Sequence, residues 1–195
     1  MNRGLLLVIS APSGAGKTTI VREVLQRFPS FEFSVSATTR EMRPGEINGR
    51  DYFFLSKSDF ENKIAGGELV EYEEIYSNYY GTLKGEIERA ISAGENIVFD
   101  VDVKGGLSIK KKFPQAVTIF IKPPSFEILK ERLEMRGSET KEQIERRLKR
   151  VPMELEKGEF YDYIIINDDL ERAVSEVSEI INNKMKEFSG GTKTN

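Results

Sequence analysis

One segment constrains the fold of this chain more than any other. It runs from Ala11 to Thr18 and reads Ala-Pro-Ser-Gly-Ala-Gly-Lys-Thr. An apolar run, Leu5 to Ile9, precedes it, and a stretch of helical character, Thr18 to Arg27, follows it. This order of strand, small-residue loop and helix is the setting of a P-loop, in which backbone N–H groups and a helix N-terminus bind phosphate. Lys17 supplies a cation for the outer phosphates and Thr18 a hydroxyl for Mg²⁺. The segment therefore predicts binding of a nucleoside triphosphate.

The segment departs from the general P-loop pattern at one position. That pattern begins with Gly, and here the first residue is Ala11. A Gly-rich turn that binds nothing is the alternative interpretation. The spacing, the Lys-Thr pair and the flanking elements all agree with the P-loop, so we favour phosphate binding.

The composition excludes several kinds of chemistry. The 195 residues include no Cys and no His, so disulfides, thiol nucleophiles, His-dependent triads and the usual zinc sites are excluded. The net charge of −3 gives no sign of a nucleic-acid or membrane partner. No signal peptide and no apolar run of membrane-spanning length is visible. We therefore expect a cytoplasmic protein.

Apolar runs of strand character recur along the chain, with helical patterns between them. This alternation predicts an α/β fold, a P-loop three-layer core with a parallel sheet. Asp100 closes one run and should lie at the carboxyl end of its strand, where open α/β sheets bind ligands. The runs are Leu5–Ile9, Asn96–Asp100, Val117–Ile121 and Tyr163–Asn167.

The other segments divide the chain into three parts. Residues 34–83 read as a small mixed α+β insert, residues 125–157 as two charged helices, and residues 1–33, 84–124 and 158–195 as one discontinuous core domain. Within the insert we expect a polar loop at Thr38–Asp51, a capping box at 56–59 that opens a helix, a strand at Leu69–Ile75 and a turn at Asn78–Gly81. The remaining expected elements are a strand at 52–54, helices at Lys84–Ala93, Ser125–Arg136, Thr140–Lys157 and Asp169–Phe188, a break at Gly137-Ser138 and a frayed tail from Ser189.

Several arginines could neutralise phosphate charge, which is the main requirement of phosphoryl transfer. Arg40 and Arg43 lie in the polar loop, where a structural salt bridge would add little. The arginines of the charged helices, by their pattern alone, are more typical of a solvated helix face. Two tyrosines, Tyr52 and Tyr80, could equally be core residues. The helical set comprises Arg132, Arg136, Arg146, Arg147 and Arg150.

A family resemblance assigns these residues more sharply. The blocks Ser34–Arg40, Arg43–Glu46, Asn48–Tyr52 and Asn78–Thr82 resemble the two substrate segments of guanylate kinases. Further motifs match in order: Asp100-Val101-Asp102, Pro123-Pro124-Ser125, Arg132-Leu133, Arg136-Gly137 and Ile166 to Asp169. The resemblance covers about residues 4 to 188. It differs at Lys104, where Gln is common in the family, so the role of this position stays open.

The resemblance implies a P-loop core, a GMP-binding insert and a lid at 125–157 that together transfer the γ-phosphoryl group of ATP to GMP, with Mg²⁺. It implies that Glu71 reads the guanine through two hydrogen bonds that adenine cannot make. By role, the implied residues are as follows: ATP-binding Ser13, Gly14, Ala15, Gly16, Lys17, Thr18, Thr19 and Asn167; GMP-binding Ser36, Arg40, Arg43, Glu46, Tyr52, Glu71, Tyr80, Thr82 and Asp100; catalytic Lys17, Arg43, Arg132, Arg136 and Arg147; and metal-binding Thr18.

Two other functions stay open at this point. One is a non-catalytic guanylate-kinase-like interaction module, against which the intact P-loop argues. The other is a kinase for a different nucleoside monophosphate, against which the tyrosine-bearing insert argues. The sequence also leaves open the use of dGMP and the oligomeric state.

Overall fold

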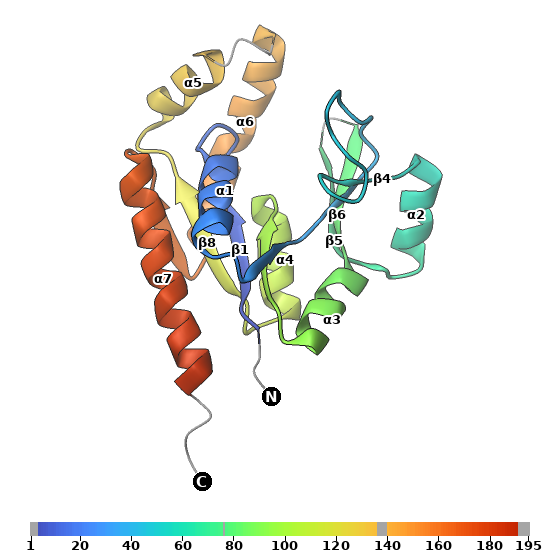
Figure 1. Ribbon diagram of the computed structural model, residues 1–195. Helices are drawn as coiled ribbons and strands as arrows, with labels where there is room; N and C mark the ends of the chain where they lie inside the picture. The colour runs from blue at the N-terminus through green and yellow to red at the C-terminus, as the bar shows by residue number, and fades with distance from the viewer. Residues whose placement is uncertain (1–3, 76, 136–139, 191–195) are drawn as a thin grey trace.

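A five-stranded parallel sheet forms the centre of the protein (Figure 1). The structure is a computed structural model that describes residues 4–75, 77–135 and 140–190. All neighbouring strands of the sheet run parallel. In spatial order they are β2 (Phe31–Phe33), β7 (Asn96–Asp100), β1 (Leu6–Ser10), β8 (Val117–Lys122) and β9 (Tyr163–Ile166).

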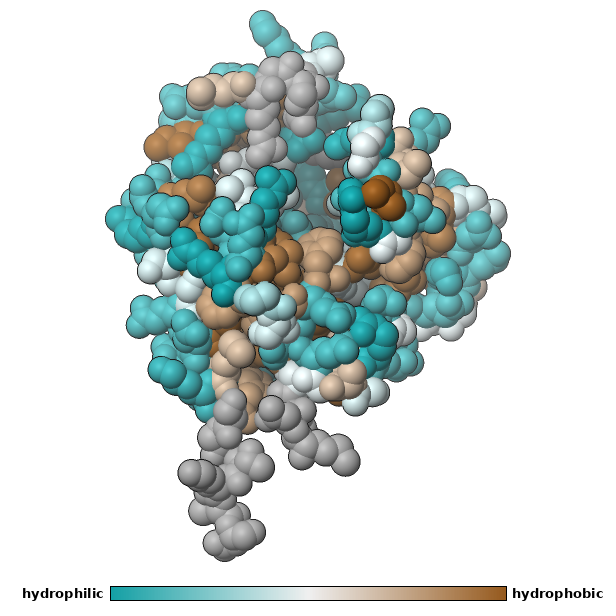
Figure 2. All heavy atoms as spheres, viewed as in Figure 1, coloured by the Kyte–Doolittle hydropathy of each residue, from teal (hydrophilic) through white to brown (hydrophobic). Residues whose placement is uncertain are grey.

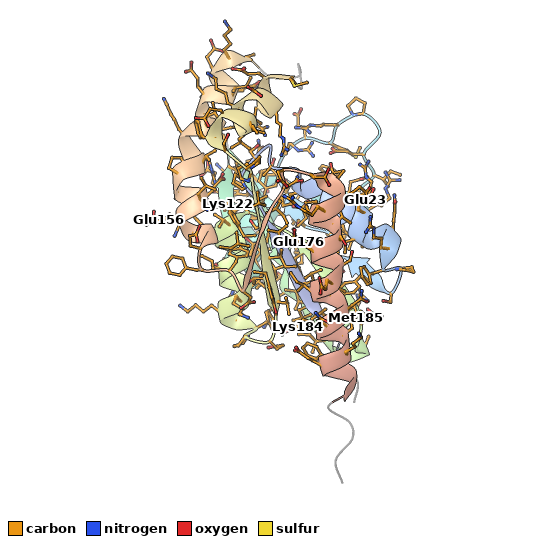
Figure 3. All side chains as sticks on the ribbon, turned by 90° about the vertical axis from the view of Figure 1, so that its left-hand side faces the viewer. Glu23, Lys122, Glu156, Glu176, Lys184 and Met185 are labelled. Carbon is orange, nitrogen blue, oxygen red and sulfur yellow. The ribbon has the colours of Figure 1, made fainter. Side chains whose placement is uncertain are left out.

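Helices cover both faces of this sheet. Successive residues of a strand point to opposite faces. On β1, Leu7 and Ile9 pack with α1 (Lys17–Arg27) and α7 (Leu170–Gly190), whereas Leu6 and Val8 pack with α3 (Lys84–Ala93) and α4 (Val103–Lys112). All five β1 residues are buried, as expected for a strand with a hydrophobic layer on each side. Figure 3, turned by 90°, shows α7 lying along the sheet, with Met185 in its C-terminal half.

A second, four-stranded sheet stands beside the core (Figure 1). Its strands are β4 (Phe53–Phe54), β3 (Ala37–Thr38), β6 (Asn78–Leu83) and β5 (Leu69–Ile75), in that spatial order. The helix α2 (Lys57–Ala65) packs on this sheet through the fully buried Phe60, whose ring stacks on Tyr79 at 5.3 Å between centroids. The side chain of Ser56 accepts a hydrogen bond from the Asp59 N–H and caps α2.

Two further helices flank the other side of the P-loop. They are α5 (Phe126–Met135) and α6 (Lys141–Gly158). The helix α6 begins with a complete capping box, in which Thr140 and Gln143 each satisfy the other's backbone N–H. Figure 1 shows these helices and the second sheet on opposite sides of the core's upper end. Most of the surface in the same view is hydrophilic (Figure 2).

The predicted α/β class with a parallel sheet is confirmed. The turn predicted at Asn78–Gly81 is wrong, because these residues begin strand β6, which pairs antiparallel with β5 from Asn78 to Leu83. The reversal lies before it, where Ser77 has a positive φ of 67°. The last helix continues to Gly190, past the predicted start of the tail at Ser189. The break predicted at Gly137-Ser138 lies outside the described residues.

Candidate functional site

The loop after β1 has the backbone geometry of a phosphate-binding loop. Gly14 and Gly16 have φ values of 94° and 95°, in the left-handed region that favours glycine. Gly16 is the N-cap of α1, so the helix N-terminus opens directly behind the loop. A Cβ on Gly16 would lie 2.3 Å from Nδ2 of Asn167, which donates a hydrogen bond to the Ala15 carbonyl at 2.7 Å. Asn167 therefore supports the loop from behind.

Lys17 is held at the carboxyl end of the central strands. Its Nζ forms an ion pair with Asp100, the last residue of β7, and donates to the Val101 carbonyl oxygen at 3.0 Å. Ile9 and Asp100 are partners in the parallel register of β1 and β7, which brings the carboxylate beside the P-loop. The prediction that Asp100 lies at a strand's carboxyl end is confirmed.

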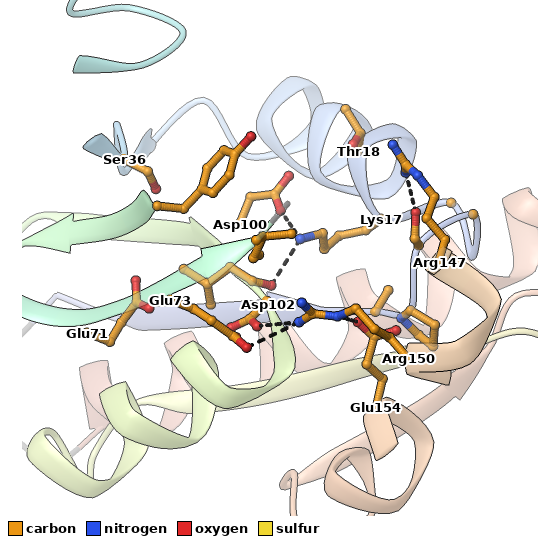
Figure 4. Close-up of a pocket in the computed structure, with 18 of the residues that line it drawn as sticks. Lys17, Thr18, Ser36, Glu71, Glu73, Asp100, Asp102, Arg147, Arg150 and Glu154 are labelled. Atoms are coloured by element: carbon orange, nitrogen blue, oxygen red, sulfur yellow. Dashed lines mark hydrogen bonds and ion pairs between the residues drawn. The ribbon is translucent and has the colours of Figure 1, made fainter. Parts of the chain in front are cut away.

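A cavity of about 350 Å³ opens between the P-loop and the second sheet (Figure 4). Its wall includes P-loop residues on one side, residues of the second sheet on the other, and α6 residues. The predicted site residues that line it are Ser13, Gly14, Gly16, Lys17, Thr18, Thr19, Ser36, Tyr52, Glu71, Tyr80, Asp100 and Arg147. One cavity thus faces both the phosphate-binding loop and the predicted substrate segment.

Glu71 is a half-buried residue of β5 whose carboxylate has a fixed partner. Thr82, fully buried on β6, donates from Oγ1 to Oε1 of Glu71 at 2.6 Å. Burial raises the pKa of Glu71, and the Thr82 hydrogen bond offsets part of that rise. A Cβ on Gly105 would lie 2.6 Å from Oε2 of Glu71, so any larger residue there would displace the Glu71 carboxylate. Thr82 does not line the cavity, and its hydroxyl contacts the cavity-lining Glu71.

Within the polar loop, the side chains of Arg40 and Glu46 pair with each other. Arg40 donates two hydrogen bonds to the Glu46 carboxylate, at 2.7 and 3.0 Å, and Glu46 also accepts the Arg43 backbone N–H at 2.7 Å. The Arg40 guanidinium lies 5.4 Å from the ring centroid of Tyr52, which in turn lies 6.1 Å from that of Tyr80. Burial raises the pKa of Tyr52 to about 12, so its hydroxyl stays protonated at neutral pH. Arg40, Arg43 and Glu46 do not line the cavity, and Arg43 is exposed.

The predicted lid arginines take different positions. Arg147 donates to Oγ of Ser13 in the P-loop at 2.5 Å. Arg132 donates to the carbonyl oxygen of Asn167 at 3.0 Å, behind the loop and outside the cavity wall. Arg136 lies outside the described residues.

The cavity wall also holds four charged residues that are not among the predicted site residues: Glu73, Asp102, Arg150 and Glu154. The sequence positions of two of these residues, relative to predicted site residues, indicate that they face the cavity. Residue 73 is two positions after Glu71 and shares its strand face, and residue 150 is three positions after Arg147 on one helix face. In the sequence, the run of acidic residues around 73 and the run of basic residues around 150 both resemble solvated surface.

Two carboxyls of this group have raised pKa values. The pKa of Asp102 rises to about 7, first because of burial and second because of its hydrogen bond with Glu73. Burial also raises the pKa of Glu154. Near neutral pH Asp102 therefore holds less negative charge than an ordinary carboxyl.

The donor set fits a metal ion that arrives with a nucleotide. Among the described residues, no three His, Cys, Asp or Glu side chains are grouped to hold a metal. Mg²⁺ at nucleotide sites is held by few protein groups together with phosphate oxygens and water. The Thr18 hydroxyl, in the first turn of α1 at the cavity wall, is a suitable group. In the described part of the chain, no helix has the length and apolar character needed to cross a membrane.

The fold and the cavity define a P-loop nucleotide-binding protein of the α/β class, whose cavity extends from the loop to the second sheet. A sequence profile described as guanylate kinase matches residues 3–184. The chain is similar to guanylate kinases of Symbiobacterium thermophilum (46% identity, covering 92% of this chain and 85% of the relative) and Chlorobium luteolum (50%, covering 92% of both). It is also similar to the crystal structure of guanylate kinase from Anaplasma phagocytophilum, with a TM-score of 0.76 at 30% identity, covering 95% of this chain and 88% of that one. The chain belongs to the guanylate kinase family.

Proposed function

We propose that the cavity binds ATP on the P-loop and GMP on the second sheet, and that the chain brings their phosphates together there. The chain is an ATP:GMP phosphotransferase, as its family membership establishes, and converts ATP and GMP into ADP and GDP. The observation that carries the assignment of the two sites is the single cavity lined both by Lys17 and by Glu71. A kinase needs both nucleotides in one water-excluding space, because water would otherwise accept the phosphoryl group.

On the ATP side, the loop from Ser13 to Thr19 would bind the phosphates through backbone N–H groups and the N-terminus of α1. Lys17 would move from Asp100 to the outer phosphates. Arg147, already at Ser13, would neutralise charge that develops on the transferred group, as would Arg132 and Arg136. Asn167 would lie near the adenine.

On the GMP side, two groups of residues divide the work. The GMP phosphate would be held by Arg40, Arg43, Tyr52 and Tyr80, with Glu46 orienting Arg40. The guanine would be read by Ser36, Glu71, Thr82 and Asp100. The attacking GMP phosphate oxygen is already ionised at neutral pH, so no general base is required. This agrees with a chain that has no His.

Mg²⁺ is part of the proposal. Thr18 and the ATP phosphates would hold it, and when bound it neutralises phosphate charge during transfer. We also propose that residues 34–83 and 125–157 are an insert and a lid that move over a discontinuous core when both nucleotides bind. A cytoplasmic location remains a prediction.

A coupled ADP-release assay with ATP, Mg²⁺ and each nucleoside monophosphate tests the assignment. We expect turnover with GMP and far less with AMP or UMP, because only guanine offers the two donors that suit Glu71. Equal turnover with the three would contradict it. Calorimetric titration with ATP separates the kinase from a non-catalytic interaction module, which would not bind ATP.

A further inference from the structure

A cluster of charged side chains on the cavity wall joins three separate elements (Figure 4). Arg150 of α6 contacts Oε1 of Glu73 on β5 at 3.3 Å and Oδ2 of Asp102, the N-cap of α4, at 3.5 Å. Its Nε also lies 3.5 Å from Oε1 of Glu154, one turn further along α6. Lys104 of α4 donates to the same Glu73 oxygen at 2.6 Å.

These pairs are more sheltered from water than ordinary surface salt bridges. The side chains of Arg150, Glu73 and Asp102 are only 23%, 15% and 17% exposed. Water screens such charges poorly, and removal of one partner leaves the other charge buried. Because Asp102 is protonated near neutral pH much of the time, Glu73 is the main anionic partner of Arg150.

The geometry links this cluster to the P-loop through one helix. Arg147 and Arg150 are three positions apart and lie on the same face of α6. Arg147 reaches Ser13 on the ATP side of the cavity, and Arg150 reaches Glu73, next but one to Glu71 on the opposite side. The middle of α6 therefore borders the cavity, with Arg147 on the side of the P-loop and Arg150 on the side of β5.

We propose that Arg150 is a positioning residue for phosphoryl transfer: its ion pair with Glu73 holds α6 at the distance from the P-loop at which Arg147 meets the transferred phosphate. The proposal rests on the proposed function, in particular on the role of Arg147. An arginine side chain has several freely rotating bonds, so its helix must be fixed if the guanidinium is to meet a phosphate. A misplacement of about 1 Å in a catalytic group can cost about 100-fold in rate.

The test compares turnover of Arg150→Ala, Glu73→Gln, Arg147→Ala and the double variant Arg147→Ala/Arg150→Ala. Arg146→Ala is the matched control, because it removes the same charge from an exposed neighbour on the same helix. We expect Arg150→Ala and Glu73→Gln each to lower kcat about 10- to 100-fold with little change in the two KM values. Arg150→Lys should restore part of the loss, and Arg146→Ala should retain kcat.

The double variant gives the decisive readout. If Arg150 acts by positioning Arg147, its loss costs nothing further once Arg147 is absent, so the two effects are strongly non-additive. Additive effects, or an Arg150→Ala variant with normal kcat, would overturn the proposal. A wild-type protein without GMP-dependent turnover would instead overturn the proposed function. If Arg150→Ala does not give a cooperative melting transition, Glu73→Gln with Arg147→Ala replaces it in the same comparison.

Discussion

Gly16 and Asn167, far apart in the sequence, are in such close contact that no side chain fits between them. A Cβ on Gly16 would come within 2.3 Å of the Asn167 amide nitrogen, and Gly16 also has a positive φ. Gly16→Ala therefore adds a steric clash to backbone strain of about 1–2 kcal/mol. We expect it to lower the melting temperature and to weaken ATP binding strongly, as measured by calorimetry.

Gly67→Ala is the matched control for that substitution. Gly67 also has a positive φ, of 65°, but a Cβ there would meet nothing within 4 Å. It should therefore show the strain alone, with a small loss of stability and unchanged ATP affinity. Equal ATP affinities for the two variants would mean that the contact with Asn167 does not shape the loop.

Lys17→Ala should reduce turnover by roughly 10²–10³-fold or more, because it removes a cation from the phosphates being transferred. Lys186→Ala, which removes an exposed lysine from α7, should have no such effect. The measurement is kcat in the coupled assay, with melting curves to show that both variants fold. A Lys17→Ala rate near that of the wild type would refute its role.

The raised pKa of Asp102 predicts that the stability of the protein depends on pH. Its pKa of about 7 in the folded protein lies above its ordinary value of 3.8, so folding favours the protonated form. The contribution of this group to the free energy of unfolding is therefore full below about pH 4 and is lost as the pH rises through 7. Asp102→Asn imitates the protonated form and still caps α4. The melting temperature of the variant, measured relative to that of the wild type, should therefore be higher at pH 8 than at pH 5.

Asp168→Asn is the control for this experiment. The Asp168 carboxyl is exposed, and its hydrogen bond with Arg172 lowers its pKa, so its charge is constant from pH 5 to 8. Its substitution should shift the melting temperature equally at both pH values. A shift for Asp102→Asn that is also independent of pH would contradict the raised pKa.

The parts of the fold that could be predicted are those with local signals. The apolar runs of β1, β7 and β8 are buried on both faces, so their composition alone marks them as strands of a parallel sheet. The run of β9 is equally apolar, although this edge strand leaves Ile164 and Ile166 exposed. The helix at Lys84–Ala93 was predicted with its observed bounds, and Gly94 ends it with a φ of 70°. Strand β4, at Phe53–Phe54, lies within the strand predicted at 52–54, whereas β3 has only two residues, too few for any periodicity.

The cavity wall was harder to predict, because it depends on contacts between distant residues. Glu73 resembles a solvated residue until β5 is seen beside α6, which brings Arg150 to it across 77 positions of sequence. Charge patterns alone do not distinguish a solvated helix face from one that borders a polar cavity. Lys104 stands where the family commonly has Gln, and here its ammonium group donates a hydrogen bond to Glu73.

Glu71→Gln should lower kcat/KM for GMP by about 10- to 100-fold, because the amide replaces an acceptor oxygen with a donor that faces the donors of guanine. Discrimination between GMP and AMP should fall with it. Glu74→Gln is the control, since Glu74 lies on the same strand but is exposed. Unchanged discrimination in Glu71→Gln would place guanine recognition elsewhere.

Thr82 provides a test of Glu71 that leaves the carboxylate in place. Thr82→Val keeps the shape of the side chain but removes the 2.6 Å hydrogen bond, which orients Glu71 and holds its pKa down. The pKa of Glu71 should then rise further. As the solution is acidified, the variant should therefore lose GMP recognition at a higher pH than the wild type does. We expect kcat/KM for GMP to decrease, and its acidic limb to move to higher pH. Thr82→Ser retains the hydroxyl and should restore the wild-type pH profile, whereas a Thr82→Val profile identical to that of the wild type would show that Thr82 does not act through Glu71.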